Sequence, residues 1–267
     1  MSSKIRLIVI LSTLVVVGLA LSSAAAWRSS DWRGFALNLG TEPVGAVVTY
    51  FLFDQFIERK EKIEAEKARL MAELGSSVND VEIAAADKLR RHGWLFDGSV
   101  QGADLEGANL EGANLGGANL QRVSLARACL KGSDLSLAHL EEAKLVGARL
   151  QEAGLEGTHL EGTKLGFAQL KEARLERAHL ERASLYEAKL GKANLQVAGL
   201  IQANLVGAFL EDADLRGTYL EGANLVDAYL KGAHLEGATL PDDTKWTPDA
   251  DMARFTDPNP PNLWRPE

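Results

Sequence analysis

Leucine recurs at every fifth position of this 267-residue chain from Leu105 to Leu240, 28 times without interruption. A period of five drifts around an α-helix of 3.6 residues per turn and makes no apolar stripe on it. A short fixed period instead predicts a solenoid, in which each unit stacks on the units before it. The residue two positions before each leucine is alanine in 23 of the 28 units, and the others are also small: Val123, Ser133, Thr158, Thr163 and Thr218.

The unit reads Ala-polar-Leu-X-X, so the small residue and the leucine must be the two inward positions. Four units close a square coil of 20 residues, and the 140 residues of 101–240 make about seven coils. Coils that pair through their backbones lie roughly 4.8 Å apart, which gives a rod about 34 Å long. We therefore predict an all-β solenoid with a leucine core, which includes Leu105, Leu110, Leu115, Leu120, Leu125, Leu130, Leu235 and Leu240.

Units such as Ala-Asp-Leu-Glu-Gly at 103–107 resemble the A(D/N)LXX unit of the pentapeptide-repeat family. The resemblance implies a right-handed quadrilateral β-helix over 101–240. It implies no single activity, because the family is functionally mixed.

Some members of this family mimic duplex DNA and bind topoisomerases, which is one alternative function. However, 14 basic residues are interspersed with the 19 acidic residues of the repeats, whereas a mimic needs dense acidic ladders. The net acidity also disfavours binding to nucleic acid.

An apolar run over 5–26, with Lys4 and Arg6 at its start, is long enough to span a bilayer. The small residues at 22–26 also fit the cleavage region of a signal peptide, so both readings stay open. A second segment, 34–57, would complete a two-helix hairpin and a membrane anchor over 1–58. Basic residues then gather at the N-terminus and between 59 and 69, which places the repeats in the cytoplasm at a bacterial plasma membrane.

The flanks of the repeats are expected to be helical on one side and extended on the other. A charged helix is predicted from Asp54 to Leu74, and its part beyond the anchor, 59–75, is the juxtamembrane helix. Phe56, Ile63 and Leu70 recur every seven residues along it. This is either a short coiled coil, which would make the protein a homo-oligomer, or a solvated spacer. The segment 241–267 holds six of the seven prolines and is predicted to be a lid anchored by Trp246, Phe255 and Trp264.

The segment 76–100 is predicted to contain a helix from Asn79 to Arg91 that covers the first coil. Asn79 is a suitable N-cap and Gly93 a suitable stop. One apolar stripe would face the solenoid, because exposed solenoid ends are strand edges that proteins cover. Its residues are Val78, Val81, Ala85 and Leu89.

Any function must lie on outward positions, which stack at a spacing of 20 residues and form what we call ladders. One ladder contains His139, His159 and His179, with Glu156 and Glu176 on the same face. Imidazole and carboxylate groups bind zinc, but parallel side chains do not converge as four ligands do. A plain solvated ladder and a pH-sensitive surface are the alternatives, and we assign no metal, cofactor or catalytic residue.

A second outward feature is apolar. Val206 stacks on Val226 and Phe209 on Tyr229, with Tyr186 further along the same side. Contiguous exposed apolar surface usually marks an interface, here for a second copy, another protein or the chain's own C-terminal segment. The repeats carry no nucleophile with a paired base. The sequence thus predicts a non-enzymatic, membrane-anchored scaffold for protein–protein interaction.

Overall fold

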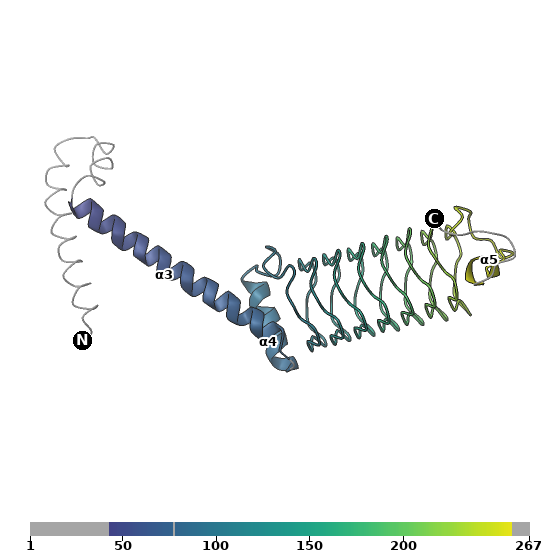
Figure 1. Cartoon of the computed structure of the whole chain (residues 1–267), viewed down its shortest axis with the longest axis horizontal. Coiled ribbons are helices and arrows are strands. Elements are labelled where there is room, and N and C mark those ends of the chain that lie inside the picture. Colours follow the sequence, from purple (N-terminus) through teal and green to yellow (C-terminus); the bar gives the residue numbers. More distant parts are fainter. Residues whose placement is uncertain (1–42, 77, 258–267) are drawn as a thin grey trace, which may run out of the picture. The chain divides into compact units, whose positions relative to one another are not determined.

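The computed structural model describes residues 43–76 and 78–257, which fall into two compact units divided between Glu66 and Lys67. Helix α3 spans Pro43–Leu74, α4 spans Asn79–Arg91 and the short α5 spans Ala253–Thr256. Between α4 and α5 the chain winds into stacked coils (Figure 1). These coils contain isolated β-bridges in place of long strands.

The coils stack with a period of 20 residues. Parallel bridges join each residue that precedes a leucine to the residue 20 positions on, from Asp104 and Ser124 to Tyr219 and Thr239. Stacked rings on neighbouring coils lie 4.7–4.9 Å apart, which is the spacing of backbone-paired strands. Four five-residue units therefore make each turn, and the predicted β-solenoid over 101–240 is confirmed.

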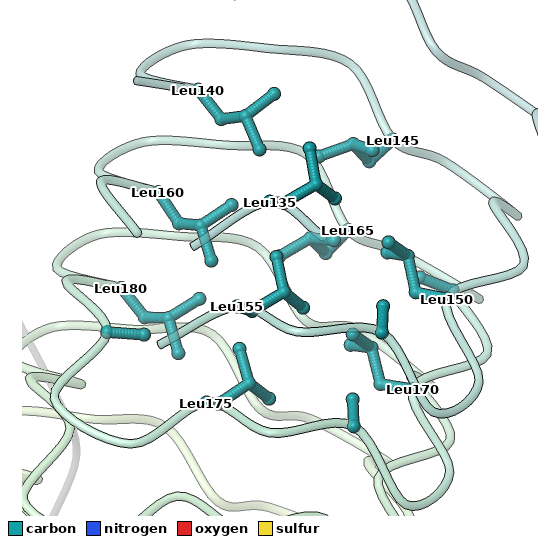
Figure 2. Close-up of a cluster of buried hydrophobic side chains, with 14 of the residues drawn as sticks. Leu135, Leu140, Leu145, Leu150, Leu155, Leu160, Leu165, Leu170, Leu175 and Leu180 are labelled. Atoms are coloured by element: carbon teal, nitrogen blue, oxygen red, sulfur yellow. The ribbon is translucent and has the colours of Figure 1, made fainter. Parts of the chain in front are cut away.

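Leucine side chains fill the interior in four columns (Figure 2). Leu140, Leu160 and Leu180 lie one above another in one column, and every repeat leucine except Leu230 is buried. Burying each leucine contributes about 1.5–3 kcal/mol, which offsets the ordering of a narrow rod. Four of the small inward residues carry a hydroxyl group: Ser133, Thr158, Thr163 and Thr218. Each hydroxyl donates a hydrogen bond to a leucine carbonyl at 2.7–2.8 Å, so none of them is an unpaired polar group in the core.

A tight turn forms each corner of the coil. The leucine carbonyl accepts a hydrogen bond from the N–H three residues on, as from Ala108 to Leu105 at 3.1 Å. The residue two positions after each leucine from Leu105 to Leu235 has a positive φ, for example 71° at Gly107 and 75° at Gly237. This is the geometry of a type II turn. Fewer than half of these left-handed positions are glycine, so the others hold a side chain in a conformation that favours glycine.

Two helices cover the first coil. Leu70 and Leu74 at the end of α3 are fully buried with Ala85 and Leu89 of α4 in one apolar cluster. The predicted coiled-coil positions Phe56 and Ile63 are exposed, whereas Leu70 belongs to this cap. The end of α3 therefore helps to cover the first coil of the solenoid. The sequence analysis did not predict this role.

The face that α4 turns inward differs from the predicted stripe. Val78 and Val81 are 56% and 40% exposed, whereas Glu82 is fully buried. Glu82 Oε1 accepts a hydrogen bond from the backbone N–H of Asn109 at 2.8 Å, whereas Oε2 is buried without a hydrogen-bond partner among the described residues. The prediction that Asn79 caps α4 is also wrong: Val78 is the N-cap residue, and the Asn79 amide donates to the carbonyls of Asn109 and Glu111.

The segment after the last coil folds back on it. Lys245 forms an antiparallel bridge with Thr239, and the N–H of Trp246 donates to Ala238 O at 2.9 Å. Phe255 in α5 is buried in the cluster that contains the leucine columns, and Trp246 packs against that cluster. The third predicted anchor, Trp264, lies outside the described residues.

The predicted membrane anchor is only partly within the described residues. The run 5–26 lies outside them, as does the first part of 34–57. From Pro43 the second segment forms the start of α3, which continues without interruption to Leu74, so position 58 is not a helix boundary. Within the described ranges, no helix combines the length and the apolar character that crossing a bilayer requires.

Candidate interaction surfaces of the rod

The histidine ladder, which we define as His139, His159 and His179, is a stack of parallel rings. The ring centroids are 4.7 Å apart between the first two histidines and 4.8 Å apart between the last two, with interplanar angles of 4° and 3°. Backbone bridges join the same three residues, so the coil spacing sets the ring spacing. The structure therefore brings together the three histidines that the sequence placed on one ladder.

The carboxylates beside these rings are Glu141, Glu161 and Glu181. Each lies two residues after a histidine, and the distances from Nδ1 to Oε1 are 3.1, 3.3 and 3.9 Å along the ladder. The predicted partners have other contacts: Glu156 pairs with Arg174 at 2.5 Å, and Glu176 accepts a hydrogen bond from the Asn194 amide at 2.5 Å. The sequence reading missed the true partners, although His-Leu-Glu recurs at 139–141, 159–161 and 179–181.

The histidine contact affects the ionisation of the first of these carboxylates. Burial raises the pKa of Glu141, but hydrogen bonds from its own backbone N–H, from His139 and from Gln121 together hold that pKa below its usual value. Glu141 is therefore ionised at neutral pH. The ladder thus presents a carboxylate beside an imidazole on each of three successive coils.

The aromatic patch, which we define as Val206, Phe209, Val226, Tyr229 and Tyr186, lies on the opposite side of the square coil. Phe209 and Tyr229 stack at 4.9 Å with an interplanar angle of 3°. Val206 and Val226 are half-buried, whereas Tyr229 is 53% exposed. The ring of Tyr186 meets the edge of Phe167 at 5.4 Å, which adds a residue that the sequence reading did not include.

The C-terminal segment passes beside this patch without burying it. The backbone N–H of Asp227 donates to Thr256 O at 2.8 Å, so the segment runs next to the last coil. Tyr229 nevertheless keeps half of its surface exposed with residues up to Asp257 in place. The described residues therefore leave an aromatic surface available on this side of the rod.

Charges elsewhere on the rod are interleaved. Arg122 pairs with Glu142 at 2.8 Å across one coil, and Arg216 pairs with Asp214 at 2.5 Å. Hydrogen bonding to Arg216, against a smaller opposing effect of burial, holds the pKa of Asp214 below its usual value. Exposed pairs of this kind contribute about 0–1 kcal/mol each. Their main consequence is that the acidic ladders are interrupted by basic side chains.

Comparison with known proteins identifies the repeat. The family model for pentapeptide repeats matches in eight copies, over 101–136, 133–168, 163–198 and 198–232. Among solved structures, the chain is similar to HetL of the cyanobacterium Nostoc, a pentapeptide repeat protein involved in heterocyst differentiation regulation. The identity is 36%, over 54% of this chain and 75% of HetL, with a TM-score of 0.47.

Two further solved structures are similar at lower identity. Rfr23, a pentapeptide repeat protein of the cyanobacterium Cyanothece, is 27% identical over 60% of this chain and 99% of its own, with a TM-score of 0.25. Full-length QnrB1, a plasmid-mediated fluoroquinolone resistance protein, is 21% identical over 53% and 81% of the two chains, with a TM-score of 0.28. No curated protein matches the chain. From the repeat and its match to HetL, the chain belongs to the pentapeptide-repeat family, and its coil is the right-handed quadrilateral β-helix of that family.

Proposed function

We propose that this chain is a non-enzymatic scaffold, held at a membrane, that presents the aromatic patch of a rigid β-helix to a protein partner. The observation that carries the proposal is the stack of half-buried Phe209 and exposed Tyr229 on a rod whose interior is already filled. Aromatic side chains are enriched at protein interfaces, where they bury large areas. The patch therefore has the composition of a binding surface.

Backbone pairing between coils orders this surface before a partner binds. Parallel bridges join Lys189 to Phe209 and Phe209 to Tyr229, which fixes the spacing of the two rings before any partner arrives. A pre-ordered surface loses less conformational entropy on binding than a mobile one. Pentapeptide-repeat proteins are generally structural or protein-interaction proteins, which agrees with a non-enzymatic role.

Photo-crosslinking tests the surface. A photoreactive phenylalanine analogue would replace Tyr229 in the full chain, and its matched control would replace Tyr219, which is 43% exposed on the opposite side of the coil. We expect a crosslinked product from position 229 and none from position 219. A product of twice the chain's mass would identify the partner as a second copy. Equal or absent crosslinking at both positions would refute the proposed interface.

The membrane part of the proposal is supported by the sequence alone. The apolar run over 5–26 has the length of a bilayer span, and the charge bias favours repeats on the cytoplasmic side of a bacterial plasma membrane. Fractionation of cells that express the full chain tests this, combined with protease access from each side of the membrane. We expect the intact N-terminus in the membrane fraction and protection of the repeats from external protease. A soluble chain that lacks its first residues would instead indicate a cleaved signal peptide.

A further inference from the structure

Beside the histidine ladder lie three carboxylates that pair with no lysine or arginine among the described residues. Within the described ranges, the ion pairs of Glu141, Glu161 and Glu181 are all with the three imidazoles. The second oxygen of each carboxylate, Oε2, is buried without a hydrogen-bond partner among these residues. Three carboxylates therefore repeat at the coil spacing beside the stacked imidazole rings. Such an arrangement favours an added cation.

The possible metal-ligand atoms of these side chains are also close enough together for several of them to bind the same cation. His139, Glu141 and His159 form one group, and Glu161, His179 and Glu181 form a second. Within each group one ligand atom per residue lies within 4.8 Å of the others. Ligands of zinc lie about 2.0–2.2 Å from the ion, so the parallel rings of His139 and His159 must tilt toward each other to share one. These side chains are partly exposed at the rod surface, which leaves room for such rotations.

We propose that the histidine ladder binds a divalent transition-metal ion of the zinc type, coordinated by His139, Glu141 and His159. Two imidazole nitrogens and one carboxylate oxygen suit such an ion, and water would complete the tetrahedron. The second group offers only one nitrogen and shares the His159–Glu161 contact with the first. Its ion would lie close to the first, so it binds more weakly. The site lies on the side of the coil opposite the aromatic patch and is independent of the proposed function.

Zinc titration of the full chain tests this proposal, with calorimetry or equilibrium dialysis as the readout. We expect one tight zinc ion per chain, followed by weaker binding. The His159→Ala variant removes a direct ligand and should weaken the tight site at least about tenfold, since even indirect supports of metal sites are worth 10–100-fold. Glu141→Gln should weaken the same site while keeping the side-chain shape.

Two matched controls separate this site from general surface binding. His234→Ala removes a histidine that is bridged to Asp214 on another ladder, and Glu156→Gln removes a carboxylate that pairs with Arg174. Both controls should bind zinc as the unaltered chain does. A circular dichroism spectrum of each variant shows whether the β-helix is intact. Absence of a tight zinc ion on the unaltered chain, or equal binding by folded His159→Ala or Glu141→Gln, would overturn the proposal.

Discussion

Leu160 and Leu137 lie on neighbouring coils of one β-helix, but their surroundings are opposite. Leu160 is 1% exposed in a column of leucines, whereas Leu137 is 65% exposed at a corner where φ is 58°. The five-residue unit thus separates two kinds of position. Inward positions repeat one chemistry and hold the fold, while outward positions vary and can carry recognition. Residue type alone does not tell which kind a residue is, but its place in the unit does.

The largest expected change in stability comes from placing an aspartate at an inward position and comparing it with an aspartate at an outward one. Leu160→Asp buries an unpaired carboxylate in the core and should cost at least about 4 kcal/mol of unfolding free energy. Leu137→Asp should change it by less than about 0.5 kcal/mol, because aspartate tolerates the left-handed region and the site is exposed. Thermal unfolding followed by circular dichroism measures both. Similar losses in the two variants would contradict the division into inward and outward positions.

Outside the repeats, the cap helix α4 buries a charged side chain, Glu82, against the first coil. Glu82→Ala leaves the Asn109 N–H without its acceptor and should cost about 1–3 kcal/mol. Glu82→Gln retains a carbonyl oxygen at that position and should keep the hydrogen bond. If the alanine variant were as stable as the glutamine variant, this hydrogen bond would not hold the cap.

The same residue predicts a dependence on pH. Burial raises the pKa of Glu82, against a smaller lowering by the Asn109 N–H. Because the folded pKa lies above the unfolded value, stability from this group is complete below the unfolded pKa and is lost as pH rises through the folded pKa. Glu82→Gln should therefore match the unaltered chain in acid and exceed its melting temperature at neutral pH. A difference that shrinks as pH rises would contradict this sign.

The inward columns could be predicted from the sequence because a period of five leaves only one way to bury leucine. The histidine stack could also be predicted, since backbone pairing alone places residues 20 apart on one ladder. Its carboxylates could not be assigned in the same way. The sequence prediction assigned Glu156 and Glu176 by face. The glutamate two residues after each histidine instead lies in the turn that follows, and its carboxylate reaches Nδ1.

The cap shows a second limit of the sequence reading. A hydrophobic stripe favoured Val78 and Val81, whereas the open edge of the first coil requires a hydrogen-bond acceptor that Glu82 supplies. That requirement appears only when the solenoid end and α4 are seen together. Burial patterns of helices that cover strand edges thus depend on backbone hydrogen bonds as well as on apolar periodicity.

The smallest expected change in stability comes from substitutions at the corners of the coil, where the backbone has a positive φ. Gly112 has φ 71° and open space for a Cβ, so Gly112→Ala isolates the backbone penalty. We expect a loss of about 0.5–1 kcal/mol, because left-handed strain of 1–2 kcal/mol is partly offset by the lower entropy of the unfolded chain. Leu137→Gly should produce a gain of similar size, since its exposed side chain gives little burial. Melting temperatures that move in the same direction in both variants would show that side-chain contacts, and not φ, control stability at the corners.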